Sequence, residues 1–294
     1  MNDLVRRYGL SLTAVFIAVT AFWLLALVIL PDLYLFENSF RPYLPIVEVG
    51  GPKDFYSFDN YLTFFRSPIH IEIFILTIVY SSVVTVLCFV IAYPLAYYLA
   101  KVARSNVVPT LFLLLLIPLW VSEVLRAFAW FIILALKGPL NFMLMGIGII
   151  DQPIRWMTGF RSVVIGLVYT YVLFMLFPVY NAIQSLDTNQ IEAAEDLGSP
   201  WWRTHWRVIL PHAKPGIASG AVMVFMLSAG SILVPTLLAS TNSRWFTEII
   251  QQWMFEAQDW NTGSAYAFLL LLICTIFISI VMRLFRVKLS DIAK

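Results

Sequence analysis

The stretch QIEAAEDLGSPWWRTHWRVILPHAKPG (190–216) is a polar segment between two apolar segments of membrane-spanning length. Its first part is rich in glutamate and alanine, which favour a helix, and Gly198 suits the left-handed residue that ends one. The pair Ser199-Pro200 follows as an N-cap serine and a first-turn proline. A second helix, WWRTHWRVI, is therefore expected to run up to Leu210-Pro211, so that two short helices meet at a glycine corner.

The two expected helices differ in what they present to their surroundings. The second carries three tryptophans and two arginines, a composition that also suits a helix resting on lipid headgroups. The first is acidic, and Ala193 and Ala194 leave one face small, so it would gain little from lipid. We therefore interpret the first helix as a docking surface for a protein partner.

The composition of the whole chain indicates a membrane protein. Of its 294 residues, 61% are hydrophobic and only 12% are charged, whereas soluble domains carry about 25% charged residues. A net charge of +2 without a basic run argues against a nucleic-acid partner. No metal site is expected, because the histidines lack ligand spacing and Cys88 and Cys274 lie within apolar stretches, where they suit buried small side chains.

Six stretches are long and apolar enough to cross a bilayer, which takes about 20 residues. Backbone polar groups need internal partners in lipid, so each stretch is expected to be a helix. The expected spans are residues 11–30, which we interpret as an uncleaved anchor ended by Pro31, then 73–100, 107–136, 161–183, 216–239 and 264–284. Four prolines within them (Pro94, Pro118, Pro178 and Pro235) are either tolerated kinks or bends around a path.

Lysine and arginine in the loops predict the orientation. They precede the first span, fill the short connection at 101–104, recur in the polar segment and follow the last span, whereas the loop at 31–72 is mainly acidic. Both termini and the polar segment are therefore expected in the cytoplasm. We divide the chain into an N-terminal anchor and first external loop (1–72), a transmembrane domain (73–285) with a cytoplasmic loop (184–215), and a cytoplasmic tail (286–294).

The polar segment resembles the signature of ABC importer permeases, which reads E-A-A, three residues, G, nine residues and I-x-L-P. Here the matching residues are Glu192-Ala193-Ala194, Gly198 and Val208-Ile209-Leu210-Pro211, with valine in place of the usual isoleucine. The resemblance implies an all-α integral membrane protein with six transmembrane helices and the type I ABC importer permease fold. It also implies that the first helix couples to an ATPase subunit through these residues: Glu192, Ala193, Ala194, Asp196, Leu197, Gly198, Leu210 and Pro211.

A second resemblance, to the spermidine/putrescine permease branch, covers residues from about 57 to 285. It rests on SFDNY (57–61), PLWVSEVLRAFAW (118–130), KGPLN (137–141), GIIDQPIR (148–155) and VIGLVYTYVLFMLFPVYNAIQSLD (164–187). The two resemblances imply a complex with two ATPase subunits that bind ATP and Mg, a related second permease chain and an external solute-binding protein. The solute would be a polyamine, with amino-acid-like solutes, phosphonates and ferric complexes as alternatives.

Glu123 and Arg126 are charged residues within the expected third span. A charge at the bilayer centre costs roughly 2.5–3.5 kcal/mol on insertion scales, so such residues face a cavity or one another. They are either part of a solute-lining wall, where Glu123 would attract a cationic amine, or a structural ion pair. Arg126 matches the family pattern, whereas Glu123 replaces a more usual small polar residue. The full candidate set is Trp120, Ser122, Glu123, Arg126, Trp130, Ser228 and Ser231.

The small residues 228–231 of the expected fifth span permit close helix packing and leave room for a gate. In the loop before the sixth span, Glu248, Glu256 and Asp259 lie among tryptophans, as either a solvated surface or part of a dock for the binding protein.

Several classes of function lack support in the sequence. It has no G-x-x-x-x-G-K-[ST] motif to bind nucleotide phosphates, and no H-E-x-x-H motif or set of nucleophile, base and acid for catalysis. The chain is therefore expected to bind no cofactor. The rival interpretations are a transporter driven by an ion gradient, for which inverted repeats would be expected, and a membrane enzyme or assembly scaffold.

Overall fold

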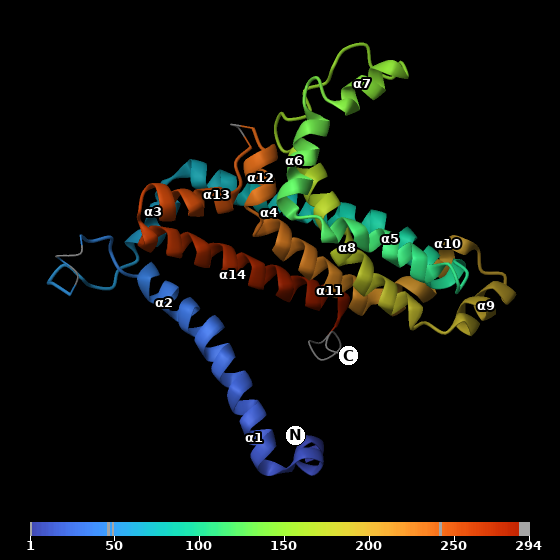
Figure 1. Cartoon of the computed structure of the whole chain (residues 1–294), viewed down its shortest axis with the longest axis horizontal. Coiled ribbons are helices and arrows are strands. Elements are labelled where there is room, and N and C mark those ends of the chain that lie inside the picture. The colour runs from blue at the N-terminus through green and yellow to red at the C-terminus, as the bar shows by residue number, and fades with distance from the viewer. Residues whose placement is uncertain (1, 46–47, 49, 241–242, 288–294) are drawn as a thin grey trace. The chain divides into compact units, whose positions relative to one another are not determined.

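The computed structural model describes residues 2–45, 48, 50–240 and 243–287, and these residues form helices and loops without a β-strand. Among the described residues, six helical segments are long and apolar enough to cross a membrane, which confirms the expected number. They are Ser11–Ser39, Pro68–Val102, Glu123–Gly146, Arg161–Gln184, Trp201–Ala229 and Trp260–Phe285. The helices are drawn in Figure 1. Most of the expected tail, from residue 288 onward, lies outside the described residues.

The chain divides into two compact units. The first comprises residues 1–68 and 250–269, and the second comprises residues 69–249 and 270–294. The first unit is held together by edge-on aromatic contacts between Phe36 and Phe268 and between Phe64 and Tyr266, with ring centroids 5.3 and 5.6 Å apart. Its helices are α1 (Asn2–Leu24), the π-helical turn η1 (Leu25–Ile29), α2 (Leu30–Ser39), α3 (Asp59–Arg66), the π-helical turn η5 (Gln252–Glu256) and residues 260–269 of α14 (Trp260–Phe285).

The second unit contains the core of the transmembrane domain. Its most extensive helix pair is α8 (Arg161–Gln184) with α11 (Leu210–Ala229), and the two lie side by side in Figure 1. Two short helices, α9 (Thr188–Asp196) and α10 (Trp201–Thr204), lie together at one end of that pair. The other elements are α4 (Pro68–Tyr97), η3 (Tyr98–Val102), α5 (Val108–Trp120), α6 (Glu123–Leu134), α7 (Pro139–Gly146), η4 (His205–Ile209), α12 (Leu233–Leu238) and α13 (Phe246–Gln251), whose last two residues belong to the first unit.

Glycine allows α8 and α11 to approach closely. A Cβ added at Gly216 would lie 2.6 Å from the Cβ of Ala182 and even closer to the carbonyl oxygen of Pro178. One turn later, a Cβ at Gly220 would lie 2.7 Å from the sulfur of Met175. Such small-residue contacts are typical of membrane helix pairs, in which van der Waals packing provides much of the attraction.

The prediction that the first span ends at Pro31 is wrong, because the helix continues to Ser39. The preceding turn η1 is π-helical, and the backbone N–H of Leu30 bonds to the carbonyl of Leu25, five residues back. A proline in a regular helix lacks one hydrogen bond, and its ring clashes with the carbonyl four residues earlier. The wider turn accommodates Pro31 within a continuous helix.

The prediction that the second short helix ends at Leu210-Pro211 is wrong for the same reason. The turn η4 is π-helical, the N–H of Leu210 bonds to the carbonyl of His205, and α10, η4 and α11 form one continuous helix from Trp201 to Ala229. Both places carry the same tetrapeptide, Val-Ile-Leu-Pro, at 28–31 and 208–211. The sequence predicts that this span ends at residue 239, but the helix ends at Ala229. Residues 230–232 are not helical and separate it from the short helix α12.

The predicted bounds of the third span, 107–136, are wrong: the structure has a shorter apolar helix, Val108–Trp120, followed by a separate segment of spanning length, Glu123–Gly146. Helix α5 ends at Trp120, Val121 has extended backbone angles, and α6 begins at Glu123. Pro118 removes one hydrogen bond from the last turn of α5, which weakens continuation. Ser122 then occupies the N-cap position of α6, and the carboxylate of Glu123 in the first turn suits the positive end of the helix dipole.

Candidate functional site

Helix α9 has defined ends that follow from its sequence. The side chain of Asp187 caps its start by accepting a hydrogen bond from the N–H of Asn189 at 3.0 Å. At its end, Gly198 adopts a left-handed conformation with φ +76°, as predicted, and donates to the carbonyl of Glu195 at 2.8 Å. The next helix is capped differently than expected: Pro200 is the N-cap of α10, and Ser199 instead donates its backbone N–H to Ala194.

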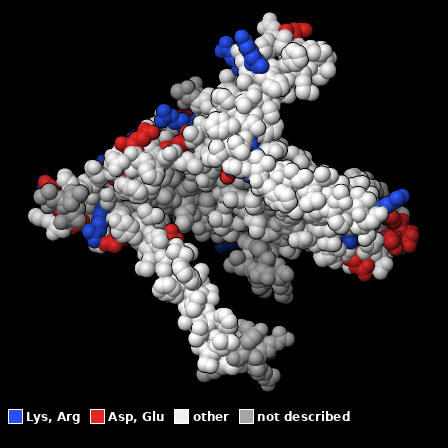
Figure 2. Space-filling view, viewed as in Figure 1, with Lys and Arg blue, Asp and Glu red and all other residues white. Residues whose placement is uncertain are grey.

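Helix α9 projects from the second unit and buries only one of its side chains, that of Ile191. Glu192, Ala193 and Asp196 are exposed, Ala194 is half-buried, and Leu197 is 88% exposed just before the glycine corner. Acidic side chains gather over this end of the molecule in Figure 2. The arrangement is a short, acidic knob with an apolar tip, whereas Leu210 and Pro211 lie apart from it, within the continuous helix that follows.

The break between α5 and α6 brings a polar cluster together. Tyr171 of α8 donates its hydroxyl to a carboxylate oxygen of Glu123 at 3.0 Å. In the described part of the chain Glu123 and Arg126 form no ion pair, so the pairing considered from their spacing is not present. The sequence reasoning missed Tyr171, although a tyrosine hydroxyl in an apolar span is a signal, because such a group needs a partner.

Part of this region has polar atoms left without a partner. Nε of Arg126 and the hydroxyl of Ser228 are buried and find no hydrogen-bond partner among the described residues, whereas the side chain of Ser231 lies beside the hydroxyl of Tyr171. Buried polar groups without partners cost free energy, and in native proteins they point to a function or to a bound molecule. Ser228 lies in the last turn of α11 and Ser231 lies within the break that follows, and Trp245 and Thr247 donate to their backbone carbonyls at 3.1 and 2.6 Å.

The remaining candidate residues of the solute pathway lie outside the polar cluster of Glu123 and Tyr171. Trp120 is 77% exposed and Ser122 is also exposed, at the break. Trp130 packs edge-on against Tyr169 with ring centroids 5.4 Å apart. Both line an apolar pocket of about 380 Å³ with Leu87 and Ile91. This pocket offers contacts for hydrocarbon, not for a charged group.

A second lining surface lies along α8 and α11, the two helices that flank the α9–α10 segment. A groove of about 640 Å³ runs between them, lined by Phe174, Phe177, Pro178, Asn181, Ala182, Ser185, His212, Pro215, Gly216, Ser219 and Met223. Ser185 and His212 are hydrogen-bonded across it at 3.1 Å. The groove thus combines polar and aromatic side chains within membrane-spanning helices.

Only part of the loop before the sixth span is exposed to solvent, so the first of the two interpretations given for it applies to that part alone. Trp245 is completely buried, and Glu248 is half-buried and accepts a hydrogen bond from the N–H of Trp245 at 3.3 Å. Burial raises the pKa of the Glu248 carboxyl above its ordinary value. Glu256 and Asp259, which belong to the first unit, are exposed or half-buried.

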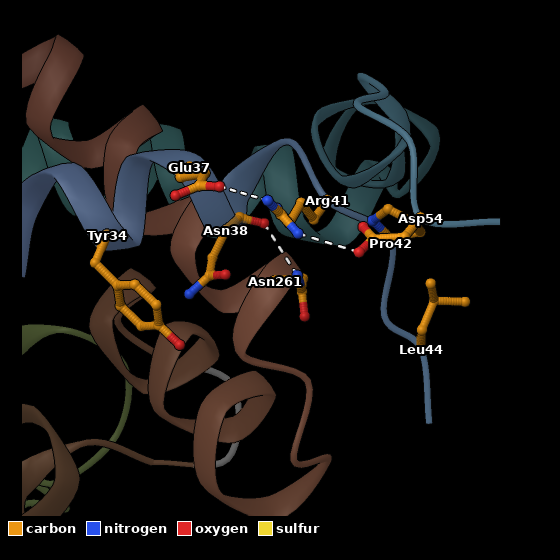
Figure 3. A pocket seen from close by; sticks show the side chains of 8 residues that line it. All are labelled: Tyr34, Glu37, Asn38, Arg41, Pro42, Leu44, Asp54 and Asn261. Atoms are coloured by element: carbon orange, nitrogen blue, oxygen red, sulfur yellow. Dashed lines mark hydrogen bonds and ion pairs between the residues drawn. The ribbon is translucent and has the colours of Figure 1, made fainter. Parts of the chain in front are cut away.

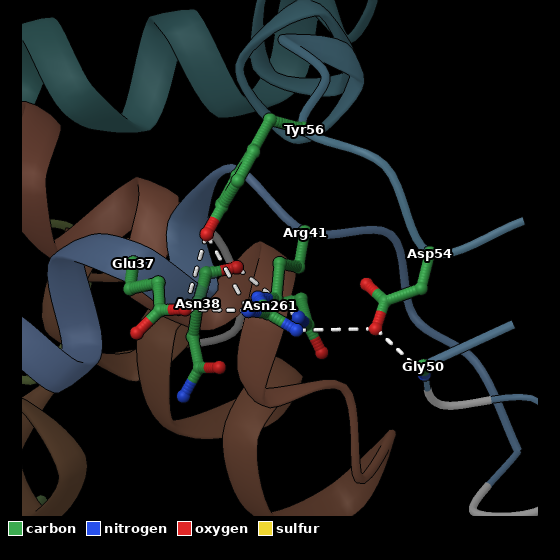
Figure 4. A network of polar contacts seen from close by, with 7 residues as sticks. All are labelled: Glu37, Asn38, Arg41, Gly50, Asp54, Tyr56 and Asn261. Atoms are coloured by element: carbon green, nitrogen blue, oxygen red, sulfur yellow. Dashed lines mark hydrogen bonds and ion pairs between the residues drawn. The ribbon is translucent and has the colours of Figure 1, made fainter.

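The first unit has its own polar network, in the loop that follows α2. Arg41 bonds to Glu37 at 2.5 Å and to Asp54 at 3.1 Å, and Asp54 also accepts the N–H of Gly50 (Figure 4). The hydrogen bonds that the Arg41 guanidinium donates, first to Glu37 and then to Tyr56, raise the pKa of Arg41. These residues line a pocket of about 380 Å³ together with Tyr34, Asn38, Pro42, Leu44 and Asn261 (Figure 3). The network fixes the loop against α2.

Comparison with known families gives one match that covers most of the chain. Residues 88–290 match the model of the family described as "Binding-protein-dependent transport system inner membrane component". The spermidine/putrescine transport system permease protein PotB of Salmonella typhimurium is 32% identical over 274 residues, which cover 92% of this chain and 94% of that protein. PotB of Escherichia coli K12 is 33% identical over 264 residues, covering 90% and 94%.

The fold is similar to that of a solved transporter. A chain of a bacterial ABC transporter involved in the import of the acidic polysaccharide alginate superimposes with a TM-score of 0.73 at 19% identity, covering 97% of both chains. In a second structure, that transporter is in complex with an alginate pentasaccharide-bound periplasmic protein, and the TM-score is 0.75 with 98% and 99% coverage.

Proposed function

The chain belongs to the family of binding-protein-dependent transport system inner membrane components, and on that premise we propose that it forms half of a solute pathway driven through α9 by a separate ATPase subunit. It is a multi-pass inner-membrane protein and the permease subunit of an ABC importer. The observation that carries the proposal is the exposed knob of Glu192 to Gly198. A surface of this kind, rigidly capped at both ends, suits a groove on a protein partner.

The proposed complex holds two ATPase subunits, which bind ATP and Mg, and a second permease that is a related but different chain. An external binding protein delivers the solute. In this arrangement α9 and both termini face the cytoplasm, which the basic residues at 101–104 and 203–214 support. The chain itself supplies no nucleotide-binding motif.

The mechanism that fits this arrangement is alternating access. ATP binding draws the two ATPase subunits together, α9 moves with them, and the spans change from an inward-facing to an outward-facing state. Hydrolysis of ATP resets the cycle. The shift between the two states is no larger than the difference in ATP affinity between them.

The proposed solute is a polyamine, which the names of the PotB relatives support. The carboxylate of Glu123 beside Tyr171 offers a negative charge and an aromatic face to an alkylammonium group. The unpartnered Nε of Arg126 favours a second candidate, a solute with an anionic group such as an amino-acid-like molecule or a phosphonate. Uptake of labelled spermidine and, separately, of a labelled phosphonate and a labelled amino acid separates the two, because only the true class is accumulated.

Reconstitution tests the assignment as an ATP-driven permease. Proteoliposomes that contain the four-subunit importer, the binding protein and internal ATP should accumulate solute, and omission of the ATPase subunit should abolish accumulation. Accumulation without the ATPase but with an ion gradient would establish the rival, a secondary transporter. Co-purification from native membranes gives an independent check, because the ATPase should be recovered with this chain and lost when Leu197 is replaced by aspartate.

A further inference from the structure

One face of the second span contacts the chain on both sides of α9. Tyr93, Tyr97 and Lys101 recur every four residues along α4 and η3, so they follow one side of that helix. The ammonium group of Lys101 donates to the backbone carbonyl of Leu186 and, at 3.4 Å, to that of Gln184. Gln184 is the last residue of α8, and Leu186 directly precedes the N-cap of α9.

The Lys101 contact is suited to its place. The last carbonyls of a helix lack partners within the helix and carry the negative end of its dipole. The ammonium group of Lys101 supplies the carbonyl of Gln184, at the end of α8, with both a hydrogen-bond donor and a positive charge. It also joins two parts of the chain that are 85 residues apart in sequence, so it is a tertiary contact and not a local cap.

The far side of α9 is bound to the same face. The hydroxyl of Tyr93 is hydrogen-bonded to Nδ1 of His205 at 2.7 Å, and Tyr97 packs edge-on against that imidazole with ring centroids 4.5 Å apart. Trp201, at the start of α10, packs on His205 with centroids 4.4 Å apart. The side chain of His205 is buried, and its hydrogen bond with Tyr93 is partly buried.

We propose that this face of α4 is a second, non-covalent mechanical connection to the coupling helix α9, here called the arm. Lys101 is the residue that positions α9 against it. Movement of α9 then reaches the second span directly, and not only through its covalent neighbours α8 and α11. The inference rests on the proposed function, because it takes α9 as the helix that the ATPase moves.

The test uses the complete importer in proteoliposomes, with solute transported per ATP hydrolysed as the readout. Lys101→Met should lower this ratio by about fivefold or more, the lower end of usual coupling strengths, while the ATPase subunit still co-purifies. Lys101→Arg keeps donors for both carbonyls and should restore most of the ratio. Arg104→Met is the matched control, because it removes the same charge three residues away, where the described structure gives the side chain no hydrogen bond or ion pair.

A second readout measures the link itself. Spin labels at the exposed positions Ser105 and Asp196, in a chain whose two native cysteines are replaced by alanine, report the distance between the end of the second span and α9. This distance should stay unchanged on ATP trapping in the otherwise native chain and should change with nucleotide in Lys101→Met. If Lys101→Met fails to assemble, Tyr93→Phe, which removes one hydroxyl, should give the same nucleotide-dependent change.

The outcomes distinguish this inference from the function on which it rests. If Gly198→Val uncouples transport but Lys101→Met and Tyr93→Phe keep the native ratio and the fixed distance, the arm is refuted and α9 remains the coupling helix. If Leu197→Asp, at the tip of α9, keeps both the ATPase and the native ratio, the proposed role of α9 is itself wrong.

Discussion

Gly198 is the residue on which the shape of the α9 knob depends. A Cβ there would meet no described atom within 4 Å, so space does not restrict the position, but its φ of +76° does. Left-handed backbone costs a residue with a Cβ about 1–2 kcal/mol, and β-branched residues tolerate it least, whereas asparagine adopts it readily. The corner therefore requires glycine for conformation alone.

This gives a matched pair of variants. Gly198→Val should disrupt the left-handed turn at the end of α9 and change the orientation of that helix. Solute transported per ATP should then fall, because movement of the ATPase would no longer be passed on fully through α9. Gly198→Asn should retain most of the coupling. Both should insert and assemble, as judged by co-purification with the ATPase. Equal coupling in the two variants would contradict a requirement for left-handed geometry.

Glu123 and Tyr171 form the other contact whose role depends on single atoms. Glu123→Gln keeps an acceptor for the tyrosine hydroxyl but removes the charge. If the carboxylate binds an ammonium group of the solute, the half-saturating concentration should rise about fivefold, the difference between a charged and a neutral hydrogen bond. Tyr171→Phe frees the carboxylate and should leave affinity equal or tighter. Concentration-dependent uptake measures both, and an unchanged value in Glu123→Gln removes the residue from the pathway.

At the scale of helices, the sequence predicts the number and approximate position of the spans because apolar length alone determines them. It does not predict where helices break. Proline is a poor guide: Pro31 and Pro211 follow π-helical turns and interrupt nothing, whereas Pro118 precedes a break at Val121. The outcome depends on the hydrogen bonds of the preceding turn, and these depend on tertiary contacts.

The candidate site shows the same difference between features that local sequence predicts and features that depend on tertiary contacts. The α9 knob is predictable because its signals are local: an acidic, alanine-rich run and a glycine at the helix end. Tyr171 and Lys101 are not, because their partners lie 48 and 85 residues away in sequence. Without the fold, a tyrosine in an apolar span and a lysine at its end look like ordinary polar residues.

The close approach of α8 and α11 gives a prediction at this scale. Gly216→Val would place two methyl groups against Pro178 and Ala182, and overpacking of this kind costs typically 1–3 kcal/mol. The helix pair should separate, so the thermal midpoint of the purified importer should fall, while Gly146→Val, where a Cβ meets no described atom within 4 Å, should leave it nearly unchanged. A native midpoint in Gly216→Val would show that the two helices are not in tight contact.

For the molecule as a whole, the question is which face of the spans meets water. Most exposed side chains of the spans are apolar and suit lipid, but the groove between α8 and α11 exposes Asn181, Ser185 and His212 beside Ser219. Polar side chains in hydrocarbon are costly and face a cavity or a partner. In the proposed complex one permease provides half of the pathway, so this groove should face the solute path that the second permease completes.

The reactivity of introduced cysteines tests whether the groove between α8 and α11 faces the solute path. In a chain without its native cysteines, Ser219→Cys should react with a membrane-impermeant thiol reagent added from the cytoplasmic side, because the groove lies next to the segment that carries α9. ATP trapping should slow the reaction as the pathway closes on that side. Leu271→Cys, on an exposed apolar face of α14, is the control and should stay unreactive in both states, because lipid excludes the charged reagent. Equal reactivity at the two positions would mean that the groove faces lipid, and the solute path would then have to lie along the polar cluster of Glu123 and Tyr171.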